Sequence, residues 1–401
     1  MNKLVVGIDP HKDSLGICIT HPDKDEVISS FSINNYSRVE TKHLIGQAYK
    51  FAYELGTRPV FVIESTNVFW RPVFSFLKRF GAEVETVNSY QTKNLRKTLM
   101  RKTKTDTIDA KLICDLYKQG KAHKTTFPPE PLFSLRELTR LYKFLVDIKA
   151  MTLNRIQGYI LQIFPELETI LSKSCSHTLF SLCAEELVHP QIVSRTRIDK
   201  LTNLLSSASH GRLSRNFATI LKSVAKTSFG LREGRIGFSF AIKALTLLYR
   251  QLENLLFNLE KERIEPLLSE VPQKFYSLKG LGTISAASYV SELGPPQRFN
   301  NANDALAWFG LDPSIAQSGR TKGTGRRISK SGTKYGRETM YLAAGSCLMH
   351  NSELKARYRQ LKAKGRKPRE AKTILAADLV KILYAMYRDN SEYNPNRIKS
   401  N

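Results

Sequence analysis

Several features that are common in membrane and secreted proteins are missing from this sequence of 401 residues. No run of about 18 apolar residues occurs, so no segment is expected to span a bilayer. The first residues, MNKLVVGIDPHK, lack the apolar stretch of a secretory signal peptide. The five cysteines are scattered without a C-x-x-C pair, which favours a reducing compartment and argues against structural zinc. We therefore expect a soluble intracellular protein.

Acidic residues are also scarce relative to basic ones. The chain has 62 Lys and Arg against 36 Asp and Glu, which gives a net charge of +26. An excess of this size favours a polyanionic partner, most simply nucleic acid. A membrane surface is the rival partner, and the missing apolar segments weigh against it. Hydrophobic residues make up 41% of the chain, enough for a substantial core over two or three domains.

The first 125 residues combine strand and helix patterns. Apolar runs at 3–9 and 14–20, with a third strand candidate at 26–34, predict three strands in a meander, and helical spacing follows at 36–55. Residues 59–65 (PVFVIES) predict a buried strand, 67–80 a helix, 82–88 another strand and 107–119 a helix. A meander followed by alternating helices and strands predicts a mixed α/β sheet that is covered on both faces.

Four acids lie at the ends of these expected elements. Asp9 ends the first strand, and Glu64 ends the apolar strand. Asp106 and Asp109 lie three residues apart where the last helix begins, so they share one helix face and repel each other. Together the four acids predict one centre with two Mg²⁺ ions that act at a phosphate. Taken singly, each acid has a plainer explanation, as a turn cap, a strand end in solvent or a complement to a helix dipole.

Two stretches of the chain are basic and contain no acid, namely residues 89–105 and 318–337. Each would suit the backbone of a nucleic acid, and the first leads directly into the pair of acids. A solvated helix face is the alternative for the first stretch, although such faces usually mix charges of both signs. The candidate nucleic-acid contacts are Lys93, Arg96, Lys97, Arg101, Lys102, Lys104, Arg320, Lys322, Arg326, Arg327 and Lys330.

The middle of the chain predicts long helices. A break at residues 127–131 (FPPEP) precedes a predicted helix that extends to Ile163 and carries Leu138, Leu141, Leu145 and Ile148 at heptad spacing. The same spacing returns at Leu245, Leu248, Leu252, Leu255 and Leu259, on a predicted helix over 236–265. Association as a coiled coil is the preferred interpretation, and an ordinary bundle core is the alternative. Residues 165–235 are helix-like without an interpretable motif, and we expect an all-α insertion there.

The last third of the chain predicts further helices. Residues 277–290 (SLKGLGTISAASYV) predict a helix-hairpin-helix, in which Gly280 and Gly282 let backbone N–H groups approach a phosphate. A plain turn between helices explains the glycines as well. Helices are expected at 303–309, 341–350 and 374–387. The expected domains are therefore 1–125, 126–270 with the insertion at about 165–235, and 271–401.

Five motifs, in this order, resemble one known family. They are G-I-D-P-H-K, V-I-E-S-T, K-T-D-T-I-D-A, K-G-L-G-T, and G-L-D-P followed by S-G-R and S-K-S-G. Together they look like the DEDD transposases of the insertion sequence 110 family, which includes Piv-type DNA invertases and bridge-RNA-guided recombinases. The resemblance extends from about residue 3 to residue 390 and is weakest across 165–235.

The resemblance implies a RuvC-like (RNase H-like) α/β domain at the N-terminus, an α-helical coiled-coil linker and a mainly α-helical C-terminal transposase domain. It implies that Asp9, Glu64, Asp106 and Asp109 form an acidic tetrad that binds metal, and that Ser318 is the nucleophile. The implied reaction forms a 5′-phosphoserine link on DNA that is selected by pairing to a noncoding bridge RNA. The implied assembly is a homo-oligomer, a dimer and then a tetramer on DNA, at the nucleoid of a bacterium or archaeon.

The chemistry of Ser318 needs help from other groups. No histidine lies near it in the sequence, so Mg²⁺ held by the tetrad is expected to polarise the phosphate and assist loss of the serine proton. A loop serine that hydrogen-bonds to its own backbone is the plainer explanation. Two other functions stay open: a metal-dependent Holliday-junction-type nuclease that uses water, and a non-catalytic nucleic-acid-binding protein. A covalent protein–DNA adduct that requires Ser318 separates the serine mechanism from both.

Overall fold

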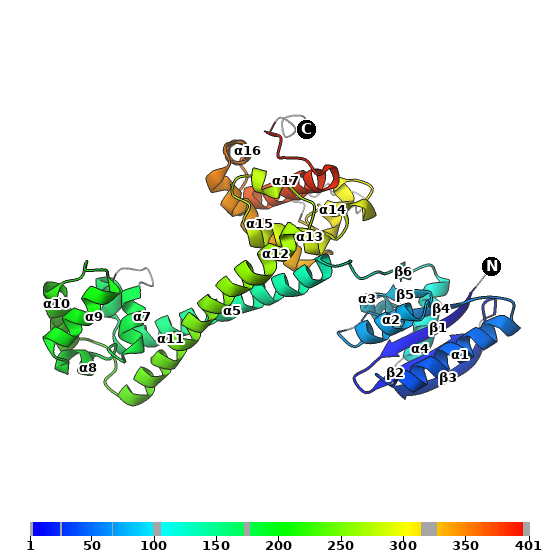
Figure 1. The fold of residues 1–401 in the computed structure, drawn as a ribbon, viewed down its shortest axis with the longest axis horizontal. Helices are drawn as coiled ribbons and strands as arrows, with labels where there is room; N and C mark the ends of the chain where they lie inside the picture. Colours follow the sequence, from blue (N-terminus) through cyan, green and yellow to red (C-terminus); the bar gives the residue numbers. More distant parts are fainter. Residues whose placement is uncertain are drawn as a thin grey trace. The chain divides into compact units, whose positions relative to one another are not determined.

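The structure of the chain is a computed structural model. It describes residues 3–24, 26–65, 67–98, 106–171, 177–313 and 327–395. The chain divides into two compact units, Met1–Phe127 and Pro128–Asn401, which Figure 1 colours from blue to cyan and from cyan to red. Within these described ranges, no helix is long and apolar enough to cross a membrane.

The first unit contains a six-stranded mixed sheet of order β3-β2-β1-β4-β5-β6. Its strands are β1 (Leu4–Pro10), β2 (Ser14–Thr20), β3 (Val27–Asn34), β4 (Pro59–Glu64), β5 (Val84–Val87) and β6 (His123–Lys124). The first three strands pair antiparallel, whereas β1, β4 and β5 run parallel to one another. The expected meander and mixed sheet are confirmed. The two-residue edge strand β6 was not predicted, because so short a strand has no periodicity of its own.

Helices cover both faces of this sheet (Figure 1). They are α1 (Arg38–Glu54), α2 (Trp70–Arg79), α3 (Ser89–Thr98) and α4 (Asp106–Lys118). Leu4 and Ile8 of β1 share a hydrophobic cluster with α1 and α2, whereas Val5 shares another with Ala110 of α4. Because side chains alternate along a strand, Asp9 faces the same side as Val5, towards α4. The sheet thus separates an apolar face under α1 and α2 from a face that carries an acid.

The second unit is mainly helical, as expected, and this confirms the predicted fold class. Its helices are α5 (Leu132–Ile163), α6 (Glu166–Ile170), α7 (His177–Ala184), α8 (Pro190–Arg195), α9 (Ile198–Ala208), α10 (Arg215–Lys226), α11 (Arg235–Asn258), η1 (Leu259–Ile264), α12 (Glu265–Ser269), η2 (Phe275–Ser277), α13 (Thr283–Leu293), η3 (Pro296–Arg298), α14 (Ala302–Trp308), α15 (Lys334–His350), α16 (Ser352–Ala363) and α17 (Pro368–Asp389). Helices α15 and α17 begin earlier than expected, because their first turns are basic and lack the apolar periodicity that predicts a helix.

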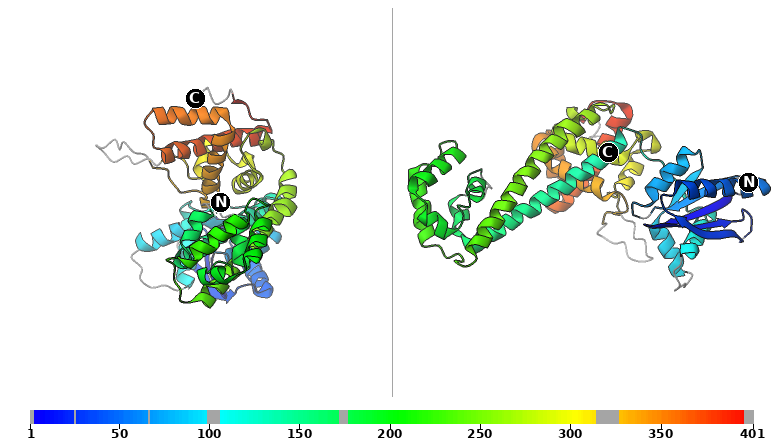
Figure 2. Two further views of the ribbon diagram at one scale, coloured as in Figure 1. Left: turned by 90° about the vertical axis from the view of Figure 1, so that its left-hand side faces the viewer. Right: turned by 60° about the horizontal axis from the view of Figure 1, so that its bottom comes forward.

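Helices α5 and α11 lie side by side and run antiparallel (Figures 1 and 2). Leu145 and Leu252 share one hydrophobic cluster, and Ile156 and Ile242 share another. Of the predicted heptad residues, Leu145 and Leu252 therefore pack within one chain, whereas Leu141, Leu248 and Leu255 are exposed. Coiled-coil contact between chains stays a prediction.

The segment between these two helices is helical, as the sequence indicates. Helices α6 to α10 share a hydrophobic cluster with the adjoining ends of α5 and α11. A second cluster joins the other ends of α5 and α11 to α12 through α17. The second unit therefore has two cores at the two ends of one helical pair (Figure 2).

Candidate active site

Asp9 and Glu64 occupy equivalent positions on two paired strands at the centre of the sheet. Strands β1 and β4 pair in parallel with Ile8 opposite Ile63, so the next residues on the two strands are Asp9 and Glu64. Since they occupy equivalent positions in a parallel pair, both carboxylates lie on the side of the sheet that faces α4. Asp9 is 6% exposed and Glu64 is 9% exposed. The structure thus brings together two acids that are 55 residues apart in the chain.

Asp109 joins them because α4 lies very close to β1. A Cβ atom at Gly7 would lie 2.3 Å from the carbonyl oxygen of Ala110 and 2.7 Å from Sγ of Cys114. Only glycine admits a helix at this distance. Asp109 directly precedes Ala110 and is 2% exposed. The close contact at Gly7 therefore sets the height of Asp109 above the sheet.

Asp9, Glu64 and Asp109 line one pocket of about 370 Å³. The other residues that line it are Pro10, His11, Asn67, Phe69, Ser89, Thr92 and Lys93. Nε2 of His11 lies 3.2 Å from Oδ2 of Asp9. Carboxylates from β1, β4 and α4 thus share this pocket with hydroxyl groups and a lysine from α3.

Asp106 is the first residue of α4, one helical turn before Asp109. Its side chain lies outside the part that the structure describes. The three described acids offer oxygen donors, which are the ligands that Mg²⁺ prefers in proteins. Among the described residues, no group of three His, Cys, Asp or Glu side chains is arranged to hold a metal ion. The donor chemistry fits a hard divalent cation, and binding one requires the carboxylates to turn towards a common point.

The predicted nucleic-acid contacts and Ser318 fall into three groups. Lys93 lies on α3 and lines the pocket, while Arg96 and Lys97 lie on the same helix with side chains that are not described. Arg327 and Lys330 are exposed in the second unit. The candidates that lie outside the described residues are Arg101, Lys102, Lys104, Ser318, Arg320, Lys322 and Arg326. Of the predicted nucleic-acid contacts, the structure therefore brings only Lys93 to the acids, within the described part of the chain.

The two ends of the segment that carries Ser318 are held together. Pro313 and Ile328 form an antiparallel bridge. The backbone N–H of Ser329 donates to the carbonyl oxygen of Asp312 at 2.8 Å, and the Ser329 hydroxyl donates to Oδ1 of Asp312 at 2.5 Å. The residues that flank positions 314–326 on both sides are thus neighbours in space.

Gly280 and Gly282 have different structural roles. Gly280 has a φ of +93°, and a Cβ atom there would lie 2.8 Å from Cα of Cys347 in α15. Packing against α15 therefore requires a glycine at 280 without any nucleic-acid contact. Gly282 is the N-cap of α13, and a Cβ atom there would meet open space. A phosphate contact at these glycines stays a prediction.

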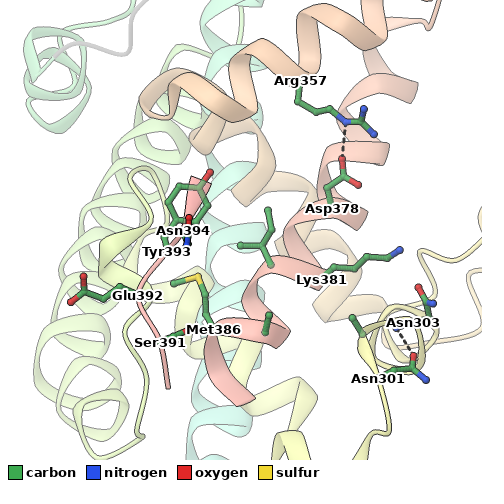
Figure 3. Close-up of a pocket in the computed structure, with 13 residues that line it drawn as sticks. Asn301, Asn303, Arg357, Asp378, Lys381, Met386, Ser391, Glu392, Tyr393 and Asn394 are labelled. Atoms are coloured by element: carbon green, nitrogen blue, oxygen red, sulfur yellow. Dashed lines mark hydrogen bonds and ion pairs between the residues drawn. The ribbon is translucent and has the colours of Figure 1, made fainter. Parts of the chain in front are cut away.

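A larger pocket of about 450 Å³ lies in the second unit, between α14, α16, α17 and the residues that follow α17 (Figure 3). Within it, Nε of Arg357 donates to Oδ2 of Asp378 at 3.3 Å. Burial raises the pKa of the Asp378 carboxyl, and the charge of Arg357 opposes that rise. None of the acids or basic residues that the sequence singled out lines this pocket.

Ser89, Thr92, Asn67 and Phe69 are not among the residues that the sequence predicts for the site. Residues 89–105 are predicted to be a basic stretch with a solvated helix face as the alternative, and the structure forms a helix over Ser89–Thr98. A signal was present, because Asn88 follows the apolar strand β5 and is a favoured residue before a helix. In the structure Oδ1 of Asn88 accepts a hydrogen bond from the backbone N–H of Tyr90 at 2.9 Å.

Two family models match the chain. A transposase model named for DEDD transposases of IS110 matches residues 6–165, and a model of the IS116/IS110/IS902 transposase family matches residues 273–359. An uncharacterized 43.6 kDa protein of insertion element IS110 from Streptomyces coelicolor is 23% identical over 354 residues, which cover 86% of this chain and 85% of the relative. An uncharacterized 44.8 kDa protein of insertion element IS116 from Streptomyces clavuligerus is 25% identical over 302 residues, 73% of each chain.

Solved structures were also matched. RuvC of T. thermophilus in complex with a Holliday junction substrate is 18% identical and covers 31% of this chain and 99% of its own, with a TM-score of 0.21. A second Thermus thermophilus RuvC structure is 16% identical with the same TM-score of 0.21, and covers 30% of this chain and 99% of its own.

The first of the two transposase family models spans all four acids of the predicted tetrad, and the second spans Ser318.

Proposed function

Since this chain belongs to the IS110 family of transposases, enzymes that act on DNA, we propose that it cuts and rejoins DNA through a serine-linked intermediate. The observation that carries the proposal is the pocket that Asp9, Glu64 and Asp109 line together. Three buried carboxylates in one pocket repel one another and lose hydration, so their proximity costs folding free energy. A cation that binds all of them offsets that cost, and a phosphate is the usual substrate of such a centre.

The proposed metal ligands are Asp9, Glu64, Asp106 and Asp109, with two Mg²⁺ as the cofactor. When bound, these ions would polarise a phosphate and favour the ionised form of a hydroxyl group beside it. The chain's own contribution is to hold the acids at the ends of β1 and β4 and on α4. His11 orients the Asp9 carboxylate through their 3.2 Å contact.

Ser318 is the proposed nucleophile. Its Oγ forms a bond to phosphorus while the bond from phosphorus to the 3′ oxygen breaks. The serine loses its proton, and the departing 3′ oxygen gains one. The products are a 5′-phosphoserine link and a free 3′-OH. The phosphodiester energy is kept in the link, so a 3′-OH of a partner strand then attacks the phosphorus and releases the serine without an outside energy source.

Charge that builds on the phosphate in this step needs donors nearby. Arg320, Arg326 and Arg327 follow Ser318 in the sequence, and we assign them to that task. Arg327 is exposed, as such a role requires. Helix α3 and the residues after it would carry the DNA backbone beside the acids.

The proposed partners are donor and target DNA together with a bridge RNA that selects them by base pairing. A net charge of +26 supports binding to more than one polyanion. A homo-oligomer, a dimer that becomes a tetramer on DNA, would supply the two serines and the two acidic pockets that an exchange of strands between two duplexes needs.

A denaturing gel tests the proposal. Full-length protein is incubated with Mg²⁺ and labelled DNA that carries the element's ends, and covalent protein–DNA adducts are scored. The wild-type protein and Ser331→Ala are expected to form the adduct, because the exposed Ser331 lies outside the proposed mechanism. Ser318→Ala is expected to form none. Cleavage by Ser318→Ala at the wild-type rate would favour the nuclease that uses water, and activities that are indifferent to Mg²⁺ would favour a non-catalytic binding protein.

A further inference from the structure

The pocket has a part that the proposed acid and serine chemistry leaves unused. Ser89, Thr92 and Lys93 line it from the first turns of α3. We propose that these three residues form a phosphate-binding subsite, which holds a backbone phosphate of the DNA strand that is being cut. The inference deepens the proposed function and rests on it for the identity of the strand.

Thr92 supplies the clearest observation. The residue is 2% exposed, and its hydroxyl has no hydrogen-bond partner among the residues that the structure describes. A buried hydroxyl without a partner lowers stability, so natural folds rarely keep one that serves no purpose. Since Thr92 lines the pocket, a phosphate oxygen entering it would accept the missing hydrogen bond.

The surroundings of Thr92 favour an anion. Lys93 is exposed and lines the same pocket. Helix α3 contains no acid, and its N-terminus, where the helix dipole is positive, begins at Ser89. The hydrogen bond from Tyr90 to Asn88 fixes this first turn. A hydroxyl, an ammonium group and the N-terminal turn of one helix therefore line the same pocket.

The division of charge within the pocket explains why it contains both carboxylates and the anion-attracting residues of α3. The carboxylates come from β1, β4 and α4 and would repel a phosphate that had no other contact. The residues of α3 attract one, so a strand would be anchored on α3 and presented to the acids. The pocket volume of about 370 Å³ lies in the range of roughly 300–1,000 Å³ that is typical of ligand sites.

The first test counts phosphate contacts. Full-length protein binds a labelled single-stranded oligonucleotide of mixed sequence in EDTA, over a series of salt concentrations. Each phosphate contact contributes about 0.7 to the slope of log K against log salt for a single strand. Lys93→Gln is expected to reduce the slope by about that amount. Lys50→Gln, which changes an exposed lysine of α1 on the other face of the sheet, is expected to leave it unchanged.

The second test isolates the Thr92 hydroxyl. Thr92→Val removes it at equal size, and the thermal midpoint is expected to hold or rise because an unpaired buried polar group is lost. Oligonucleotide affinity in EDTA is expected to fall about tenfold, and Thr92→Ser is expected to restore it. Thr20→Val, at a buried threonine of β2 outside the pocket, is the matched control and is expected to bind normally.

The outcomes separate this subsite from the proposed function. Equal binding by Thr92→Val and Thr92→Ser would overturn the subsite, as would an unchanged salt slope for Lys93→Gln. Inorganic phosphate is the second probe, and Thr92-dependent binding of it without any effect on the oligonucleotide would identify a site for free phosphate and overturn the strand contact. These assays need no cleavage. If the protein shows both binding effects but does not cut DNA, the result would support the subsite and contradict the proposed serine chemistry.

Discussion

Gly7 of β1 and Ala110 of α4 are in direct backbone contact, since a Cβ atom on Gly7 would lie 2.3 Å from the Ala110 carbonyl oxygen. This contact places Asp109 over the strand that carries Asp9. One glycine thereby couples the packing of the first unit to the geometry of its acidic pocket.

The first prediction concerns this contact. Gly7→Ala forces α4 away from the sheet, which is expected to lower the free energy of unfolding by about 1–3 kcal/mol, as overpacking does. Misplacement of Asp109 is expected to slow DNA cleavage roughly a hundredfold. Urea denaturation and a cleavage time course measure the two effects.

Gly46→Ala is the control for this substitution. Gly46 lies within α1, where a Cβ atom meets nothing within 4 Å. Alanine is the better helix former, so a gain of about 0.5–1 kcal/mol in unfolding free energy is expected, with no change in cleavage. Wild-type stability and cleavage for Gly7→Ala would show that the close approach does not constrain the site.

The second prediction concerns the carboxylates. Asp109→Asn keeps the size of the side chain and removes its charge, so cleavage is expected to fall by roughly a hundredfold or more. Asp115→Asn makes the same change on α4 outside the pocket and is expected to cleave normally. EDTA is expected to abolish cleavage by every variant. Equal rates for the two asparagine variants would remove Asp109 from the mechanism.

The third prediction concerns the buried acid of the second unit. Glu292 is 2% exposed and accepts hydrogen bonds from Arg140 at 2.7 and 3.1 Å and from Thr333 at 2.7 Å. Glu292→Gln leaves the Arg140 charge without its partner and is expected to cost about 2–3 kcal/mol in unfolding free energy. That is less than for a fully buried pair, because the Arg140 side chain is 28% exposed.

Asp199→Asn is the matched control. Its ion pair with Arg215 spans 2.7 Å with both side chains more than half exposed, at 59% and 63%. Exposed pairs contribute less than about 1 kcal/mol, so chemical denaturation is expected to show little change. A loss for Glu292→Gln no larger than that for Asp199→Asn would contradict the importance of the buried network.

The fourth prediction is a pH dependence in the helical segment between α5 and α11. His189 is fully buried, and its Nδ1 accepts the backbone N–H of Gln191 at 3.3 Å to cap α8. Burial, with a smaller effect from Arg235, holds the pKa of His189 below its ordinary value of 6.5. The unfolded chain therefore binds a proton more readily than the folded one. Stability is expected to be full above about pH 6.5 and to fall as the pH drops through that value and below.

Hydrogen exchange of the α8 to α10 amides at pH 7.5 and 5.5, corrected for intrinsic rates, measures this effect. His189→Asn keeps a good capping residue without a titrating ring, so its protection is expected to be the same at both pH values. Equal protection at the two pH values in the wild-type protein would mean that His189 does not titrate with unfolding.

Much of the first unit follows from its sequence pattern. Apolar runs predict β1, β2 and β4 because these strands are buried on both faces, and the acids at the ends of β1 and β4 stand out because charge interrupts such runs. Helix α3 was predicted only as the alternative to a basic stretch, because SYQTKNLRKT has almost no apolar residue and no periodicity marks it. In the structure Asn88 caps the first turn of this helix. The helix also depends on tertiary contacts, which a sequence pattern does not reveal.

The composition of the pocket could be only partly predicted for the same reason. Thr92 and Ser89 line the same pocket as Asp9 because β5, which precedes them, pairs parallel to β4, which pairs parallel to β1. That adjacency depends on the order of strands in the sheet, which propensity and spacing do not encode. At Gly280 the sequence suggests more than the structure requires. The G-x-G pattern predicts phosphate binding, whereas the close packing of Gly280 against Cys347 already requires a glycine.

Acids from β1, β4 and α4 are proposed to hold divalent metal beside a DNA phosphate. Anomalous scattering from Mn²⁺ in crystals of the full chain with DNA would locate that metal. We expect anomalous peaks in the pocket lined by Asp9, Glu64 and Asp109, with the strand phosphate alongside. Mn²⁺ bound elsewhere, in crystals of a protein that cleaves DNA with Mn²⁺ in solution, would contradict this proposal.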